Sequence, residues 1–264
     1  MSKLQEYNGH YCESQYEYAF IQLLEAEDWN YISGKQDEGW HYLPGNSIAR
    51  NSKTAVLYED DLEHFLSKTN SDLTVDEIRQ IIDSVRLVGA ESEFSTLHKV
   101  YGWMVDGVQF IPQNGLAHMI ALIDFEHPEN NIFRVVNQFA VEYTNNGQKE
   151  TRRPDILLFV NGMPLCIIEL KNPADANATI YDAYEQITIR YWRDIPHLLH
   201  YCPLACISDG VKTRLGTIRT PYEHFYAWRR VNDGDKVSTL PFEEMQTMIK
   251  GVYSPARFLE IFRD

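Results

Sequence analysis

Three ionisable residues interrupt the otherwise apolar stretch 154–171: Asp155 near its start, and Glu169 and Lys171 at its end. Two carboxylates and an ammonium are expensive to bury unless a cation or a reaction uses them. Hydrolysis of a phosphodiester would use them, because it needs a cation to neutralise developing charge and a water held in line. Carboxylate oxygens suit Mg²⁺, and a lysine beside them can hold the attacking water. The residue types are therefore those of a site for metal-assisted phosphodiester hydrolysis.

A hairpin turn would bring the three residues together. Asn161-Gly162 is a strong turn signal, because both residues tolerate positive φ. We expect a three-residue loop over residues 161–163, which pairs Val160 with Pro164. This register sets the two carboxylates directly opposite each other. The lysine shares their face, because side chains alternate along a strand.

The same three residues also have a plainer interpretation. A bare pattern of aspartate followed by glutamate-x-lysine occurs by chance in many proteins, and Lys171 could simply pair with one carboxylate at a strand end. The context favours chemistry, since the pattern lies on two consecutive apolar strands, follows Pro154 and precedes a predicted helix. Pattern alone leaves both interpretations open.

The segments around the hairpin predict an α/β fold with a mixed central β-sheet flanked by helices. Helices are indicated by apolar residues at helical spacing, and strands by alternation of apolar and polar residues. The predicted helices are 13–27, 60–67, 73–87, 94–104, 178–192 and 242–262, the last broken at Ser254-Pro255. The predicted strands, besides the hairpin, are one within 29–51, then 108–111, 117–125, 133–143, 204–208 and 213–217.

Composition is that of an ordinary soluble domain, with 44% hydrophobic and 23% charged residues among 264. No apolar run is long enough to cross a bilayer and the first residues have no signal-peptide core, so we expect a cytoplasmic protein without membrane contact. The nine histidines show no paired spacing, which argues against zinc. The four cysteines are expected to be reduced thiols, most of them in the core: Cys12, Cys166, Cys202 and Cys206.

The net charge of −14 lies entirely in the first part of the chain. Residues 1–150 carry 10 Lys and Arg against 24 Asp and Glu, whereas residues 151–264 carry 14 of each. Binding to nucleic-acid phosphates depends on Lys and Arg. We therefore expect that a partner would have to deliver any nucleic-acid substrate.

Short motifs in and around the hairpin carry a family resemblance. They are Thr151-Arg152-Arg153-Pro154-Asp155, Asn161-Gly162-Met163-Pro164 and Glu169-Leu170-Lys171-Asn172-Pro173. The chain resembles the nuclease region of type I restriction enzyme R subunits, which belong to the PD-(D/E)xK nucleases. The resemblance continues through residues 182–186 and 191–196, takes in 136–139 upstream, and extends more weakly to the helix at 13–24.

The resemblance implies a PD-(D/E)xK (restriction-endonuclease-like) core and a role for each residue of the hairpin. Asp155 and Glu169 would bind Mg²⁺, for which Mn²⁺ could substitute, and the Leu170 carbonyl would be a possible third ligand. Lys171 would be the catalytic lysine. Glu17 would be the helix carboxylate that completes the metal site, although Glu13 fits nearly as well.

The resemblance also assigns Gln186 and Tyr191 to the family's Q-x-x-x-Y motif, which is linked to DNA handling near the site. Here four residues separate the pair, where the family has three. On an α-helix a five-residue step rotates Tyr191 well away from the face of Gln186. Either a helix irregularity restores the geometry, or Tyr191 has another role.

For the whole chain, the resemblance implies one nuclease domain over residues 1–264. Its parts would be an acidic helical region at about 1–130, a catalytic core at 131–220, and C-terminal helices at 221–264 that lead into an absent motor domain. No G-x-x-x-x-G-K-[ST] loop occurs, so ATP would bind only in the full-length subunit. The implied activity is that of a type I site-specific deoxyribonuclease, which cuts unmodified double-stranded DNA after ATP-driven translocation. Its partners would be methyltransferase and specificity subunits.

Two alternatives stay open beside this hypothesis. The acidic first part of the chain is compatible with a non-catalytic module that docks or couples parts of the same complex. A stand-alone repair or Holliday-type nuclease of the same superfamily would instead require a gene that ends near residue 264.

Overall fold

A six-stranded mixed sheet forms the centre of the protein, in the strand order β1-β4-β7-β8-β9-β10. The computed structural model describes residues 13–26, 39–45, 50, 52–88, 92–112, 115–172, 178–237 and 243–264. The pairs β1/β4 and β8/β9 are parallel, and the other neighbours are antiparallel. The strands of this sheet are β1 His41–Pro44, β4 Phe133–Asn137, β7 Ile156–Val160, β8 Met163–Leu170, β9 Leu204–Ser208 and β10 Thr213–Thr217.

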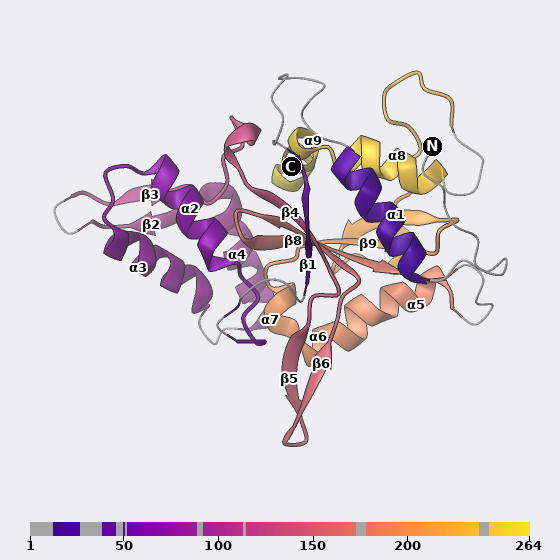
Figure 1. The fold of residues 1–264 in the computed structure, drawn as a ribbon, viewed down its shortest axis with the longest axis horizontal. Coiled ribbons are helices and arrows are strands. Elements are labelled where there is room, and N and C mark those ends of the chain that lie inside the picture. The colour runs from indigo at the N-terminus through magenta and orange to yellow at the C-terminus, as the bar shows by residue number, and fades with distance from the viewer. Residues whose placement is uncertain are drawn as a thin grey trace.

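Helices cover both faces of this sheet (Figure 1). One face carries α1 (Glu13–Ala26), α8 (Glu243–Val252) and α9 (Pro255–Arg263). The other carries α5 (Ile180–Glu185), followed by the short helices α6 (Trp192–Asp194) and α7 (Pro196–Leu199). Every residue of β7 and β8 is buried, as expected for strands with both faces covered. The predicted α/β class with a mixed, helix-flanked sheet is confirmed. None of the described helices is both long and apolar enough to span a membrane.

A second group of elements lies beside the sheet and contains much of the acidic part of the chain (Figure 1). The helix predicted over 73–87 is confirmed and starts at Val75, where Thr74 and Glu77 form a reciprocal capping box. The predicted strand at 117–125 is wrong beyond Ile120, where the extended pairing ends. The elements of this group are α2 Glu59–Thr69, α3 Val75–Arg86, α4 Glu93–Asp106, β2 Val108–Phe110 and β3 His118–Ile120.

The single strand predicted over 133–143 is wrong, because the chain breaks it into two. Gln138 adopts a left-handed φ of 48°, and β4 ends at the residue before it. The chain then enters β5 (Val141–Asn145), which pairs with β6 (Gln148–Arg152), a strand that was not predicted. This two-stranded hairpin projects from the body of the protein, at the bottom of Figure 1.

The predicted three-residue loop of the β7–β8 hairpin is also wrong. Val160 pairs with Met163 rather than with Pro164, so the turn contains only Asn161 and Gly162. Both turn residues have positive φ, at 48° and 77°. This is the backbone conformation that a two-residue hairpin turn requires.

A β-bulge restores the register expected for the carboxylates. The pairing shifts between Leu158 and Phe159, which leaves one extra residue on β8. Beyond the bulge Ile156 pairs with Ile168, so the next residues outward, Asp155 and Glu169, face each other across the hairpin. The predicted opposition of the two carboxylates therefore holds, although the predicted loop does not.

The helix predicted over residues 178–192 is not uniformly α-helical. After α5 the chain forms one turn of π-helix at Gln186–Tyr191 and then continues into α6. A π-helix joins residues five apart instead of four, so the segment contains one residue more than an α-helical turn holds.

The cysteines within the described part of the chain are free and buried, as predicted. They are Cys166, Cys202 and Cys206, and burial raises the pKa of each thiol. Cys12 lies outside the described residues.

Candidate active site

Asp155 and Glu169 lie together at the end of the β7–β8 hairpin. Asp155 Oδ2 accepts a hydrogen bond of 2.8 Å from the backbone N–H of Leu170, which ties the aspartate to the strand that carries the glutamate. Both side chains are buried, with residue exposures of 7% for Asp155 and 1% for Glu169. The structure therefore brings the two predicted metal ligands together in a place largely closed to water.

Lys171 completes the predicted set. Its Nζ lies 3.3 Å from Glu169 Oε1, 3.1 Å from the Leu170 carbonyl oxygen and 3.0 Å from Gln186 Oε1. Its backbone N–H donates to the Ser208 carbonyl at 2.8 Å, which extends the β8–β9 pairing to the lysine and positions its side chain. The ammonium therefore points at the carboxylates from the same edge of the sheet.

The electrostatics of this group are unbalanced. Burial raises the pKa of the Glu169 carboxyl well above its ordinary value, the Asp155 carboxylate raises it further, and Lys171 opposes both effects. Two buried carboxylates beside one ammonium leave an excess of negative charge if both ionise. A bound cation would remove that excess, because it favours the ionised form of each carboxylate.

The π-helix brings Tyr191 back to Gln186. Gln186 Nε2 donates to the Tyr191 hydroxyl oxygen at 2.8 Å and also to Glu169 Oε1. The Tyr191 hydroxyl lies 3.2 Å from both Glu169 Oε2 and the Arg153 carbonyl oxygen, which compete for its single proton. Of the two outcomes expected from the spacing, the helix irregularity is the one that the structure contains.

Tyr191 is a hydrogen-bond donor in a dry environment. The residue is 2% exposed. Burial raises the pKa of its phenol, and the Glu169 carboxylate raises it further. The hydroxyl therefore keeps its proton at neutral pH and can donate it to one of its two acceptors.

Glu17 is connected to the carboxylate pair through Gln138. Gln138 Nε2 donates to Glu17 Oε2 at 2.8 Å and to Asp155 Oδ1 at 3.2 Å, while Asn137 Nδ2 donates to Glu17 Oε1 at 2.5 Å. Glu17 is only 7% exposed, so it is not a solvated residue of the helix surface. The side chain of Glu13, the other candidate, lies outside the described residues.

Gln138 is a site residue to which the sequence interpretation gave no role. Its backbone N–H donates to the Asp155 carbonyl at 2.9 Å, and its side-chain amide joins two carboxylates. A signal was present, because Asn137 and Gln138 are polar residues within an apolar alternation. The left-handed φ of Gln138, which breaks the strand there, could not be read from that pattern.

The donor atoms of this site suit a magnesium ion. Mg²⁺ is usually held by one or two carboxylates together with waters and substrate phosphates. Asp155 and Glu169 supply a carboxylate pair, and Leu170 supplies a neighbouring carbonyl oxygen. Within the described ranges no three His, Cys, Asp or Glu side chains gather into a metal-binding group. The residues present therefore fit a metal that keeps open positions better than one that needs a cage of protein ligands.

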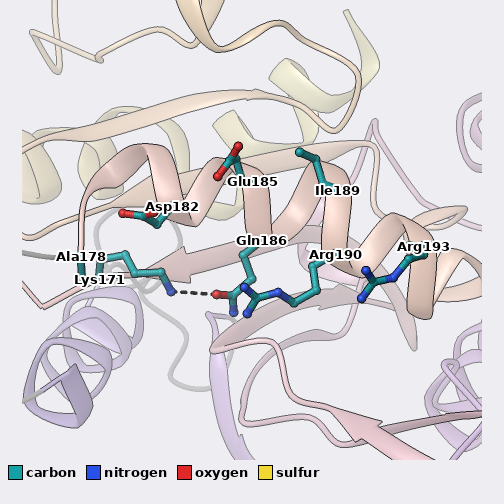
Figure 2. Close-up of a pocket in the computed structure, with 8 residues that line it drawn as sticks. All are labelled: Lys171, Ala178, Asp182, Glu185, Gln186, Ile189, Arg190 and Arg193. Atoms are coloured by element: carbon teal, nitrogen blue, oxygen red, sulfur yellow. Dashed lines mark hydrogen bonds between the residues drawn. The ribbon is translucent and has the colours of Figure 1, made fainter. Parts of the chain in front are cut away.

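An open pocket of about 490 Å³ adjoins the site (Figure 2). Lys171 and Gln186 line one part of it, and the dashed line in Figure 2 marks the hydrogen bond between them. The other residues that line it are Ala178, Asp182, Glu185, Ile189, Arg190 and Arg193. The pocket gives solvent, and any substrate, access to the lysine.

Comparison with known proteins shows the family of the chain. Residues 10–224 match the family described as the N terminus of the type I restriction enzyme R protein. The chain is 32% identical over 261 residues to the type I restriction enzyme HindI endonuclease subunit of Haemophilus influenzae, a match that covers 95% of this chain and 23% of that protein. It is 31% identical over 251 residues to a Methanocaldococcus jannaschii protein with the provisional name type I restriction enzyme MjaIXP endonuclease subunit, covering 86% of this chain and 24% of that protein. The chain thus spans about a quarter of the length of these relatives, and it belongs to the family of type I restriction enzyme R protein N-terminal regions.

Proposed function

We propose that this chain is a metal-dependent DNA endonuclease domain with a PD-(D/E)xK core, which hydrolyses phosphodiester bonds of double-stranded DNA. The observation that carries the proposal is the convergence of two buried carboxylates and one ammonium at one hairpin end, with Lys171 Nζ 3.3 Å from Glu169 Oε1. Membership of the R protein family supports it, since the relatives compared above are named endonuclease subunits.

In this proposal each residue has a separate task. Asp155 and Glu169 hold Mg²⁺, or Mn²⁺ in its place, with the Leu170 carbonyl available as a further ligand. The metal, when bound, neutralises phosphate charge and lowers the pKa of water. Lys171 orients the attacking water, and the Gln186 oxygen, 3.0 Å from Nζ, directs the ammonium.

The surrounding residues hold the ligands in place. Tyr191 and Gln186 each contact one oxygen of Glu169, which restricts rotation of the carboxylate. Gln138 acts in the same way on Asp155 and connects it to Glu17, which we assign to the support of the metal site.

Membership of the family supports a proposal for the wider role of the chain. We assign it to the R subunit of a type I restriction-modification complex, with methyltransferase and specificity subunits as partners and the cytoplasm as its location. Unmodified double-stranded DNA is the substrate, cut after ATP-driven translocation. We place ATP binding outside these residues, since they contain no phosphate loop. The neutral charge of residues 151–264 suits a domain that receives DNA from its partners.

The test is cleavage by the assembled complex that carries Asp155→Asn, Glu169→Gln or Lys171→Ala in its full-length subunit. We expect each variant to lose double-strand cleavage by about a hundredfold or more, because each removes a charge from the reacting centre. Arg79→Ala is the matched control, since Arg79 lies on α3 and 65% of its side chain is exposed. Cleavage at the control rate by all three variants would refute the proposal.

A further inference from the structure

The pocket beside Lys171 contains cationic side chains that the proposed chemistry does not use. Arg190 and Arg193 line it together with Lys171 and Gln186. Figure 2 shows these four side chains in a row along one edge of the helix, whereas Glu185 and Ile189, which also line the pocket, lie nearer its other edge. The row begins at the lysine of the candidate site and leads away from it.

Arg190 is exposed, and no ion pair or hydrogen bond to its guanidinium occurs within the described part of the chain. The nearby Asp182 forms no ion pair with it among the described residues, and its carboxylate accepts from the backbone and hydroxyl of Thr179 in a capping box. Arg193 differs, since its Nε donates to Asp194 at 2.7 Å, yet 67% of its side chain is exposed. Among the described residues, the pocket therefore presents to solvent one guanidinium without an ion pair and one that is paired with Asp194.

The π-helix explains why Arg190 faces the pocket. Successive residues of a helix point in different directions, roughly 100° apart in an α-helix and somewhat less in a π-helix. Tyr191 points inward to Glu169, so the residue directly before it points toward the rim. In an α-helix the position four residues after Gln186 would occupy the inward place itself. Because of the extra residue, Tyr191 points inward to Glu169 and Arg190 points to the pocket.

We propose that Arg190, assisted by Arg193, binds a backbone phosphate next to the one that is cleaved, so that this pocket is the track of the cut strand. The inference rests on the proposed nuclease function. A guanidinium presents paired donors that match a phosphate group, and it is less strongly hydrated than an ammonium. Local cations matter in this protein, because its overall charge of −14 repels DNA.

The test compares Arg190→Ala, Arg190→Lys and Arg79→Ala in the assembled complex. Single-turnover cleavage is measured across a salt series, with ATP-driven translocation measured in parallel. We expect Arg190→Ala to cleave about tenfold more slowly than the unmodified enzyme, which is the effect of about 1.4 kcal/mol. The cleavage rate of Arg190→Lys should lie between those of Arg190→Ala and the unmodified enzyme, and the rate of Arg79→Ala should match the unmodified enzyme. Translocation should be unchanged in all of them.

Salt dependence separates a phosphate contact from a structural effect. Loss of one phosphate contact should reduce the slope of log rate against log salt by about one, whereas a folding defect would leave the slope unchanged. An unchanged rate and slope in Arg190→Ala, with cleavage abolished in Asp155→Asn, would overturn the inference and leave the proposed function intact. Undiminished cleavage by Asp155→Asn would overturn both.

Discussion

Deletion of Ile189 tests whether the π-helix serves to place Tyr191. Ile189 is 57% exposed, so its removal costs little packing. The deletion shortens the step from Gln186 to the tyrosine from five residues to four, which is about one turn of α-helix. The π-helix should close to an α-helix that keeps the tyrosine beside Gln186. Insertion of one alanine after Ile189 lengthens the step to six and should rotate the hydroxyl away by roughly 100°.

The size of the effect follows from the contacts of the hydroxyl. It accepts from Gln186 Nε2 at 2.8 Å and lies 3.2 Å from Glu169 Oε2, where the carboxylate is 1% exposed and water cannot take its place. Loss of a partner from a buried polar group costs about 1–3 kcal/mol. If about 2 kcal/mol of that loss adds to the activation free energy of cleavage, the reaction slows about thirtyfold.

Single-turnover cleavage by the assembled enzyme is the assay, and thermal unfolding of each variant checks the fold. The deletion should cleave within about threefold of the unmodified enzyme, while the insertion should cleave about thirtyfold more slowly. Tyr191→Phe, which removes only the hydroxyl, should resemble the insertion. A deletion variant as slow as the insertion would show that the extra residue has a purpose other than placing Tyr191.

Three further predictions concern stability, measured by urea unfolding of the chain. Asn161→Ala should lower the free energy of unfolding by about 3 kcal/mol. The fully buried amide contacts the Ile132 N–H, the Leu122 carbonyl and the Asn131 side chain at 2.8–2.9 Å. An unchanged unfolding midpoint would show that these contacts contribute nothing. Gly162→Ala should lower the free energy of unfolding by at least about 2 kcal/mol, since φ is 77° and a Cβ would collide with the Tyr58 carbonyl oxygen. A loss below about 0.5 kcal/mol would contradict this close approach of the two backbones. Asp194→Asn should lose roughly 1–2 kcal/mol near pH 7, because hydrogen bonds, first from Arg193 and then from Arg152, lower the pKa of Asp194 to about 2. A carboxyl whose pKa is lower in the folded than in the unfolded chain stabilises the fold at pH values above its unfolded pKa. The difference in unfolding free energy between Asp194→Asn and the unmodified chain should therefore disappear as pH falls from about 4 towards 2. A difference that persists near pH 2 would exclude this ion-pair explanation.

The local elements could be predicted where a pattern and its boundary signals agree. The strands β9 and β10 have the predicted bounds, because two short strand-like segments lie on either side of Asp209-Gly210, a dipeptide typical of turns. The start of α3 was predictable for the same reason, since Thr74 and Glu77 form the capping box that their spacing indicates. Both cases depend only on residues close together in the chain.

The register of the site hairpin shows where such reasoning fails. The predicted loop was one residue too long, and the bulge on β8 was not predicted at all. The two errors cancel. The shorter turn shifts the pairing by one residue, and the extra residue of the bulge on β8 shifts it back. The carboxylates therefore face each other for a reason that the apolar pattern does not contain, since every residue around the bulge is apolar and none of them marks the extra position.

The left-handed backbone of Gln138 was unpredictable for a related reason. A glutamine tolerates positive φ poorly, so the residue type at 138 gives no sign that the strand ends there. The conformation is held by distant partners, namely the Asp155 carbonyl on the backbone side and the carboxylates of Glu17 and Asp155 on the side chain. Contacts separated by 17 and 121 residues leave no local signal.

The arrangement of donors supports the proposed catalytic role of the hairpin over a simple ion pair. An ion pair between Lys171 and Glu169 would need only one carboxylate, and a buried pair of that kind gains little net stability. Here a second buried carboxylate, Asp155, stands beside the first and raises its pKa, which costs stability unless something offsets it. Neutral donors from Gln186 and Tyr191 hold Glu169, and they fix its orientation without cancelling its charge. Two buried carboxylates held in fixed orientations, with one ammonium beside them, are the arrangement that the proposed metal site requires.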